Sequence, residues 1–361
     1  MELNGGSKEK VSAVLEALIS SASSNPRALA TLAHFLVAQG EVERACSLAL
    51  QARTLAPGNP EVAVLTAEIL NAGVPQWQFS IIRDERRNME FDAALRRAVR
   101  PGSRVLDIGS GTGLLAMMAV RAGASEVITC EMNPLVAQAA RKIIAANGYA
   151  DTIRVLGKHS ESLDVVEDLG GPVDVLVAEI VANDILAEGV IPVMENVVHR
   201  LLKPGGQLIP ARGSVRVALA HYSNADKRRV AATVAGFDLS LFNELAPKNI
   251  RIKLDDPGIT ILSDAADLFT FDFASGGPFP EGQSAVTLTS QSSASNGIAQ
   301  WIHLNMDDEG QYENDPRHAV PSSWSMLFYP FAIGLEYSAG ELVTICGSHD
   351  RHQLRLWTER A

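Results

Sequence analysis

Short apolar runs alternate with longer amphipathic segments between about residues 101 and 210. The apolar runs have the length of buried strands and lie at 104–108, 126–130, 153–156, 173–178 and 206–209. Helical periodicity covers the intervening segments 113–121, 134–147 and 189–202. This alternation predicts a doubly wound parallel sheet with helices on both faces. Ligands bind such sheets beyond the carboxyl ends of their strands.

The segment before this region is helical in pattern and rich in alanine, from residue 11 to about 72. Asn25-Pro26 opens one unit and Asn59-Pro60 opens another 34 residues later, which is the tetratricopeptide period. One repeat matches well, whereas a solenoid normally needs three. Two interpretations stay open: a helical spacer packed on the next domain, and a docking surface for a partner protein.

Beyond residue 211 the pattern changes to short β-rich runs separated by Gly, Pro, Ser and Asp. Such runs predict an antiparallel barrel or sandwich. Residues 222–255 interrupt them with a mixed segment in which apolar side chains stand among polar neighbours. We therefore expect three regions, at 1–74, 75–210 and 211–361.

The glycine-rich stretch Arg-Val-Leu-Asp-Ile-Gly-Ser-Gly-Thr-Gly occupies residues 104–113, with Asp107 ahead of Gly109, Gly111 and Gly113. A strand that enters a helix through a glycine turn holds nucleotide-like ligands, because the backbone approaches the ligand where no Cβ intervenes. No Lys-Ser/Thr pair follows, which disfavours a phosphate-binding P-loop. The D-x-G-x-G-x-G form resembles motif I of the S-adenosylmethionine-dependent methyltransferases.

A second acid, Glu131, ends the β-branched run Glu-Val-Ile-Thr-Cys-Glu. It stands about 20 residues beyond the glycines, where a carboxylate that accepts the ribose hydroxyls is expected. The alternative is a turn acid ahead of Asn133-Pro134. The paired spacing favours the ribose contact.

Composition narrows the range of partners. The chain has 361 residues, 47% of them hydrophobic, and a net charge of −11. The negative charge disfavours non-specific nucleic-acid or membrane binding and suits a cationic substrate. The three scattered cysteines show no metal or redox spacing, so we expect no metal and a reducing compartment. With neither a signal peptide nor a membrane-length apolar run, a cytoplasmic protein is expected.

Two glutamates flank the loop after the strand at 173–178. Glu179 and Glu188 stand at its ends and Asp184 between them, where the topology predicts a site beside the cofactor. The alternative for Glu188 is a helix N-terminal acid favoured by the helix dipole. The Glu-x8-Glu pattern resembles the double-E loop of the protein arginine N-methyltransferases.

The resemblance to this family runs from about residue 75 to 361. Ile-Ile-Arg-Asp-Glu-Arg-Arg-Asn-Met-Glu-Phe resembles the cofactor-capping helix, which implies that Arg87 binds the cofactor's carboxylate. Gly-Lys-His-Ser-Glu resembles the adenine-contacting turn and implies that His159 and Ser160 lie near the adenine. The β-rich half resembles the family's barrel, and residues 222–255 resemble its dimerisation arm, which implies a homodimer.

The resemblance implies methyl transfer from S-adenosylmethionine to a guanidinium nitrogen of arginine in a protein substrate. The tetratricopeptide-like segment is similar to that of family member nine, and Gly-Phe-Asp and Asn-Met-Asp-Asp-Glu-Gly resemble member seven, although both carry two modules. Because arginine stays protonated, its guanidinium must approach a cationic sulfonium. Two carboxylates offset that repulsion by charge-assisted hydrogen bonds. Asp184 and Trp324 are expected to position the substrate.

Two departures from the family stand out. Ser322-Ser323-Trp324 occupies the place of a His-Trp pair that orients a glutamate, with His318 as a substitute or as a plain surface residue. Val181 stands where relatives have a bulky Met or Phe. Two other functions therefore stay open: a methyltransferase of this fold acting on another nucleophile, and a tetratricopeptide scaffold with a degenerate catalytic module.

Overall fold

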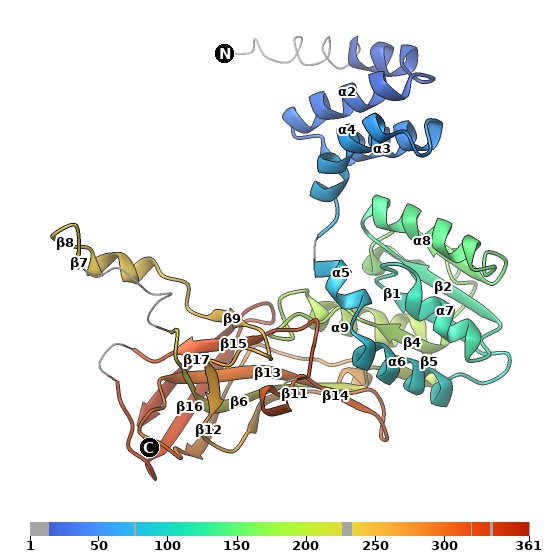
Figure 1. Cartoon of the computed structure of the whole chain (residues 1–361). Helices are drawn as coiled ribbons and strands as arrows, with labels where there is room; N and C mark the ends of the chain where they lie inside the picture. The colour runs from blue at the N-terminus through green and yellow to red at the C-terminus, as the bar shows by residue number, and fades with distance from the viewer. Residues whose placement is uncertain (1–13, 76, 226–232, 319, 333–334, 361) are drawn as a thin grey trace, which may run out of the picture. The chain divides into compact units, whose positions relative to one another are not determined.

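A computed structural model of the chain describes residues 14–75, 77–225, 233–318, 320–332 and 335–360. The chain divides into two compact units, residues 1–79 with 133–139 and residues 80–132 with 140–361. The first unit is helical, and the second contains the sheets (Figure 1). Among the described residues, no helix is long and apolar enough to cross a membrane.

The helical unit contains α2 (Pro26–Ala38), α3 (Val42–Leu55) and α4 (Pro60–Ala72). α2 and α4 begin in the same way: the side chains of Asn25 and Asn59 accept hydrogen bonds from the N–H groups of Ala28 (3.1 Å) and Val62 (3.2 Å). In each helix a proline follows the asparagine, at a position where its fixed φ suits the first turn. The predicted 34-residue period is thus the spacing between the first residues of α2 and α4.

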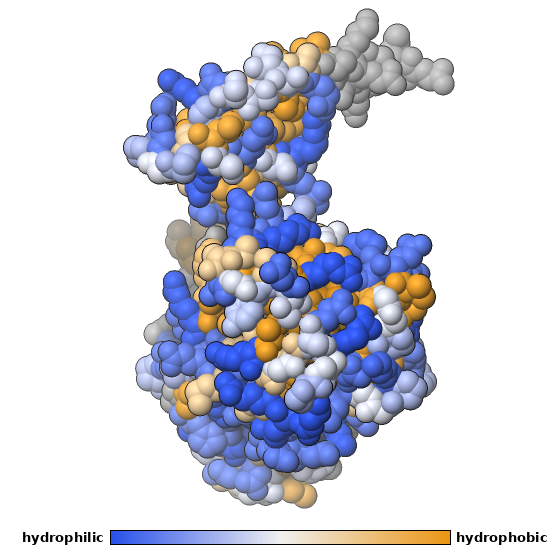
Figure 2. All heavy atoms as spheres, turned by 90° about the vertical axis from the view of Figure 1, so that its right-hand side faces the viewer, coloured by the Kyte–Doolittle hydropathy of each residue, from blue (hydrophilic) through white to orange (hydrophobic). Residues whose placement is uncertain are grey.

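Small buried side chains let these helices pack closely, chiefly Ala30, Ala33, Ala45, Ala49 and Ala52. The helical unit also leaves large apolar side chains exposed, among them Phe35 and Val64. Apolar atoms stand out among polar ones on the face of this unit that Figure 2 shows. The predicted helical character is confirmed; the identification as a tetratricopeptide repeat stays a prediction.

The second unit holds a parallel sheet with the strand order β3-β2-β1-β4-β5. Its strands are β1 (Arg104–Ile108), β2 (Glu126–Cys130), β3 (Ile153–Leu156), β4 (Val173–Ala178) and β5 (Leu202–Ile209). All neighbouring pairs are parallel, as predicted. The chain order reverses between β1 and β4, and the carboxyl ends of strands at such a switch point form a ligand site.

The helices that accompany this sheet are α5 (Trp77–Ile82), α6 (Glu85–Ala98), α7 (Leu114–Arg121), α8 (Pro134–Ala146) and α9 (Val190–Leu201). One boundary was predicted wrongly, because Lys203-Pro204-Gly205-Gly206 does not form a turn ahead of a strand at 206. β5 already begins at Leu202 and absorbs these residues as an irregularity in its pairing with β4. Gly205 allows this through its positive φ of 77°.

The antiparallel part consists of a seven-stranded and a three-stranded sheet. The larger sheet comprises β6 (Arg212–Tyr222), β9 (Ile250–Ile252), β10 (Ile259–Ile261), β11 (Ala266–Phe271), β13 (Gly297–Asn305), β14 (Gln311–Glu313) and β15 (Met326–Pro330). The smaller one comprises β12 (Gly282–Thr289), β16 (Leu342–His349) and β17 (Leu354–Arg360). Together they form the predicted barrel (Figure 1). Tyr222, Trp301 and Phe328 belong to a buried core cluster on the larger sheet. The class I methyltransferase fold followed by an antiparallel barrel is therefore confirmed.

The segment at 222–255 carries the small hairpin of β7 (Thr233–Val234) and β8 (Phe237–Asp238) and the short helix η3 (Ser240–Leu245). Residues 226–232 lie outside the described part. Four large apolar side chains are between 69% and 80% exposed here: Phe237, Leu241, Phe242 and Leu245. Clustered exposure of this kind marks an association surface.

Candidate active site

The glycine turn joins β1 to α7 beside the end of β2. Gly113 precedes α7 with φ 80°, and a Cβ added there would lie 2.8 Å from Ile144. Glycine is therefore required by both the backbone conformation and the available space. The Gly111 N–H donates to the Glu131 carboxylate at 3.2 Å. The fold thus brings the glycine turn and Glu131 together, as their spacing in the sequence predicts.

A buried polar chain lies under this turn. Thr129 on β2 donates to the Asp107 carboxylate at 2.8 Å, and its hydroxyl is 2.6 Å from that of Ser110. Burial raises the pKa of Asp107 to about 7, against the hydrogen bond from Thr129 and with the help of the Glu131 charge. Within the described residues, Asp107 Oδ1 has no hydrogen-bond partner. A buried acceptor of this kind is suited to a polar group of a bound ligand.

Arg87 and Glu179 form a buried ion pair. Arg87 Nη2 is 2.5 Å from Glu179 Oε2, and the two side chains are 5% and 9% exposed. Burial raises the pKa of Glu179, and the Arg87 charge opposes this shift. Arg87 Nε has no hydrogen-bond partner among the described residues. The arginine expected to bind the cofactor therefore also contacts the first glutamate of the double-E loop.

Glu188 stands at the other end of this loop and is exposed to solvent. Neighbouring protein atoms nevertheless desolvate its carboxyl group in part, which raises its pKa to about 7. The negative charges of Glu179 and Asp184 contribute further to the shift. The charge of Glu179 therefore acts on Glu188 across the loop.

The two predicted substrate-positioning residues both act on the loop in this structure. Asp184 accepts hydrogen bonds from the N–H groups of Leu186 (3.1 Å) and Ala187 (3.0 Å), and so it shapes the loop's own backbone. The buried Trp324 donates from its indole nitrogen to the carbonyl of Val181 at 2.7 Å. Their predicted part in substrate positioning stays a prediction.

Ser323 occupies the place where the family has a histidine. It donates to Asp84 through its N–H (2.7 Å) and its hydroxyl (2.9 Å), and the Tyr312 hydroxyl donates to the same carboxylate at 3.1 Å. Asp84 in turn accepts from the Arg87 N–H at 2.9 Å and caps α6. The barrel thus holds the start of α6 through Ser323 and Tyr312.

His318 takes no part in this network, since its side chain is 67% exposed and lies 3.7 Å from Asp315. Neither Asp84 nor Tyr312 was predicted from the sequence as a site residue. For Asp84 a signal existed, because an aspartate at a helix start is a strong capping residue. For Tyr312 there was none, because its contact with Asp84 spans 228 residues.

His159 and Ser160 follow β3 at the carboxyl edge of the parallel sheet. His159 Nδ1 accepts a hydrogen bond from the Glu161 N–H at 3.3 Å and caps the short helix η1 (Ser160–Ser162). Ser160 is buried, whereas the His159 side chain is 45% exposed. Their contact with adenine stays a prediction.

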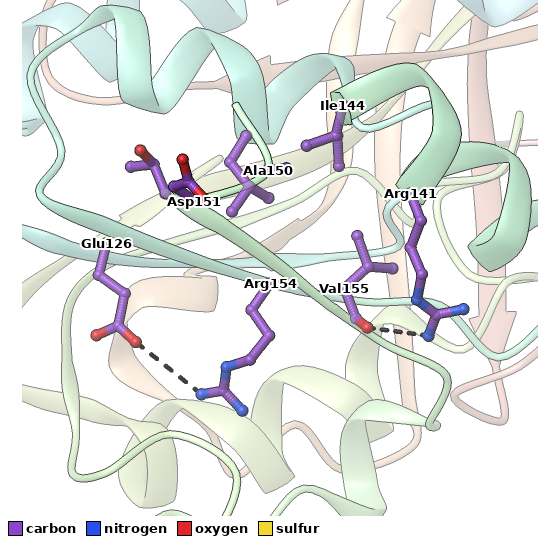
Figure 3. Close-up of a pocket in the computed structure, with 9 residues that line it drawn as sticks. Glu126, Arg141, Ile144, Ala150, Asp151, Arg154 and Val155 are labelled. Atoms are coloured by element: carbon purple, nitrogen blue, oxygen red, sulfur yellow. Dashed lines mark hydrogen bonds and ion pairs between the residues drawn. The ribbon is translucent and has the colours of Figure 1, made fainter. Parts of the chain in front are cut away.

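A cavity of about 450 Å³ lies elsewhere, at the outer edge strand β3 (Figure 3). Its lining includes none of the site residues above. Arg141 donates to the Val155 carbonyl at 2.9 Å, and Arg154 is 4.0 Å from Glu126. Because both arginines are engaged within the protein, we assign this cavity no part in the chemistry.

Comparisons with known proteins agree with this geometry. The profile of the ribosomal protein L11 methyltransferase family matches residues 93–211. The arginine N(omega)-methyltransferase of Streptomyces achromogenes subsp. streptozoticus is 39% identical over 305 residues, which cover 83% of this chain and 84% of that protein. Protein arginine N-methyltransferase 7 of Drosophila melanogaster is 31% identical over 264 residues, which cover 68% of this chain and 38% of that longer protein.

Solved structures share the fold. The Trypanosoma brucei PRMT1 enzyme–prozyme heterotetrameric complex with AdoHcy matches with a TM-score of 0.67 at 21% identity, over 78% of this chain and 97% of that one. A crystal structure of PRMT6 with SAH matches with a TM-score of 0.61 at 17% identity, over 78% and 98%. Since 39% identity extends over most of this chain and most of the Streptomyces enzyme, the chain belongs to the arginine N-methyltransferase family of S-adenosylmethionine-dependent enzymes.

Proposed function

We propose that this enzyme methylates a guanidinium nitrogen of arginine that is bound by Glu179 and Glu188. The observation that carries the proposal is the buried Glu179, which already pairs with a guanidinium, that of Arg87, at 2.5 Å. Glu188 lies within electrostatic reach of it. A carboxylate pair at the end of β4 is suited to a planar cation, because each carboxylate accepts charge-assisted hydrogen bonds from the guanidinium fork.

The residues around the glycine turn fit S-adenosylmethionine, which supplies an electrophilic methyl group on a cationic sulfonium when bound. Glu131 would hold the ribose, and Arg87, whose Nε lacks a partner among the described residues, would hold the methionine carboxylate. Asp107, which precedes the glycine turn, has a buried acceptor, Oδ1, with no partner among the described residues. His159 and Ser160 would line the adenine.

The two glutamates contribute position and charge. Their negative charges offset the repulsion between the guanidinium and the sulfonium. By fixing the fork they also align the attacking nitrogen with the methyl group, which is largely a proximity effect.

Replacing Glu131 by Ala is expected to weaken cofactor binding by about 1.5–3 kcal/mol, the usual contribution of hydrogen bonds to a charged group. Isothermal titration with S-adenosylhomocysteine measures this effect. Glu43→Ala is a suitable control, because Glu43 is an exposed acid on α3 in the helical unit, outside every proposed cofactor contact. Unchanged affinity of the Glu131 variant would rule out the ribose assignment.

The substrate is proposed to be arginine within a protein, which the name of the Drosophila relative and the net charge of −11 support. Free arginine is a second candidate, because the name of the Streptomyces relative specifies arginine alone. Labelled S-adenosylmethionine would be supplied with an arginine-rich peptide, the same peptide with lysines in place of arginines, or free arginine. Label in the arginine peptide supports the first candidate, and label in free arginine alone supports the second. Label in the lysine peptide, or in none, contradicts both.

The helical unit is proposed to dock a partner protein, supported by its repeated helix starts and exposed apolar side chains. A cytoplasmic location is likewise proposed. It is supported by Cys46, Cys130 and Cys346, which are buried and free, as expected in a reducing compartment.

The enzyme is further proposed to form a homodimer through the arm at 222–255. Charging the exposed patch by Leu241→Asp together with Leu245→Asp should convert dimers to monomers and lower activity, because the apolar contact is lost. Light scattering measures the mass. Leu342→Asp, at a 53% exposed leucine on β16, serves as the control and should leave the dimer intact. A wild-type protein that stays monomeric at high concentration would contradict the proposal.

A further inference from the structure

The loop that joins Glu179 to Glu188 is fastened at its middle by the barrel. Asn183 is held from two sides: its carbonyl oxygen accepts from Gln300 Nε2 at 3.1 Å, and its side-chain oxygen accepts from the Ser325 N–H at 2.7 Å. Trp324 donates to the Val181 carbonyl in the same part of the loop, so the barrel supplies three hydrogen bonds to Val181 and Asn183.

The fastened loop contains a strained residue. Ile185 has φ 72°, in the left-handed region that β-branched side chains rarely adopt. Its N–H donates to the Ala182 carbonyl at 2.9 Å, which closes a tight turn around Asn183. A strained backbone persists only where its surroundings determine it, and such residues cluster at functional sites. The strained turn at 182–185 therefore contains Asn183, the residue to which the barrel is hydrogen-bonded.

Gln300 is an unexpected residue at its position in β13. It is fully buried, with Ala299 and Trp301 as equally buried neighbours. Its Nε2 also donates to the Trp301 carbonyl at 3.1 Å, and its Oε1 has no partner among the described residues. An amide that leaves one buried oxygen unsatisfied is costly, whereas an apolar side chain of similar size would fill the space without this cost. Compared with an apolar side chain, the amide of Gln300 adds the hydrogen bond to the Asn183 carbonyl in the loop.

We propose that Gln300 and Asn183 are positioning residues for methyl transfer, which hold the strained loop in the form that directs Glu179 and Glu188 at one guanidinium. This inference rests on the arginine methylation proposed above. Neither residue is required to touch the substrate, because both act through the backbone between the two glutamates. Losing either contact lets the turn relax and moves one carboxylate relative to the other.

The first test compares Gln300→Met with wild type. Methionine keeps the size of the side chain and removes the donor to Asn183. We expect kcat to fall by about tenfold to a hundredfold, because a small misplacement of reacting groups causes losses of this size. The affinity for S-adenosylhomocysteine should stay unchanged. Asn296→Leu is the matched control, because this amide also bonds barrel backbone, but its partner is Tyr222, to whose carbonyl it donates at 3.0 Å, and not the loop. It should destabilise the barrel and leave kcat intact.

The second measurement is hydrogen exchange of the loop amides, which does not depend on activity. The protected N–H groups of Ile185 and Leu186 should exchange faster in Gln300→Met and at the wild-type rate in Asn296→Leu. Asn183→Leu removes the bond from Ser325 and should act in the same direction. If the Gln300 variant folds poorly, Asn183→Leu provides the same test from the loop side.

Combining Gln300→Met with Asn183→Leu should cost less than the product of the two single losses in kcat, because both contacts hold one residue. Wild-type kcat and wild-type loop exchange in the single variants would overturn the inference while leaving arginine methylation intact. A wild-type enzyme that methylates no arginine would instead overturn the proposed function, and the exchange rates would still decide whether Gln300 holds the loop.

Discussion

Glu188→Gln is expected to lower kcat for arginine methylation by about a hundredfold to a thousandfold, the usual effect of removing one preorganised electrostatic group. Glutamine keeps the shape and the hydrogen-bonding reach of the side chain and removes only its charge. Because Glu188 is exposed and, within the described part of the chain, neither a hydrogen bond nor an ion pair joins it to the glycine turn, cofactor affinity should stay near the wild-type value. Steady-state kinetics with a calorimetric measurement of cofactor binding separates the two effects.

The same change at Glu179 should differ in one respect. Glu179 neutralises the buried Arg87, so Glu179→Gln also leaves that arginine without its anionic partner. We expect an equal loss of kcat together with altered cofactor affinity and lower stability. The effects of the two changes on kcat should be less than additive, because both carboxylates serve one bound cation. Near wild-type rates in both variants would show that the double-E loop is not the substrate site.

The pH dependence of the wild-type enzyme follows from the raised pKa of Glu188, about 7. The carboxyl must be ionised to hold a guanidinium, so kcat/KM, which follows the ionisation of the free enzyme, should rise as the pH increases through about 7 and fall below it. Asp107 has a pKa in the same range, also about 7. Glu188→Gln distinguishes the two acids: an unchanged acidic limb in this variant would assign the titration to Asp107 and contradict the role given to Glu188.

Arg87→Met is expected to destabilise the protein by about 3–5 kcal/mol at neutral pH, because removing one partner of a buried ion pair leaves the other charge uncompensated. The pKa of Glu179, already raised by burial, should rise further without the opposing arginine charge. Its unfolded carboxyl still ionises at the ordinary pKa. Stability of the variant is therefore expected to be higher under acidic conditions and to be lost as the pH rises above that value.

Urea denaturation at several pH values measures this loss. The double variant Arg87→Met with Glu179→Met is the control: it removes both charges and should recover much of the stability, since replacing a whole buried pair by apolar groups is often neutral. It should recover neither cofactor binding nor methyl transfer. Wild-type stability of Arg87→Met at neutral pH would contradict the buried pair.

Much of the fold could be predicted because its signals are local. Strands β1, β2 and β4 are mostly apolar runs, and the glycine turn and Glu131 follow β1 and β2 at fixed spacing. β9, β14 and β17 were not predicted. β9 and β14 have three residues each, and β17 is an edge strand with an exposed polar face, so none has a strong apolar pattern.

The site could be predicted only in part, because its interactions join distant positions. Arg87 and Glu179 were each identified, but their pairing spans 92 residues and has no sequence pattern. The two bonds from Ser323 to Asp84 span 239 residues, so no local pattern predicts them. The sequence showed only that Ser322-Ser323 stands where a histidine was expected. Gln300 lies inside an apolar strand and gave no signal at all.

The central claim is that Glu188, with Glu179, binds the arginine that accepts the methyl group. Tandem mass spectrometry of an arginine-rich peptide, treated with S-adenosylmethionine and either wild type or Glu188→Gln, tests it most directly. We expect the wild-type enzyme to place methyl groups on guanidino nitrogens and the variant to leave the peptide almost unmodified over the same time. Methyl groups on another side chain, or equal methylation by both proteins, would contradict the claim.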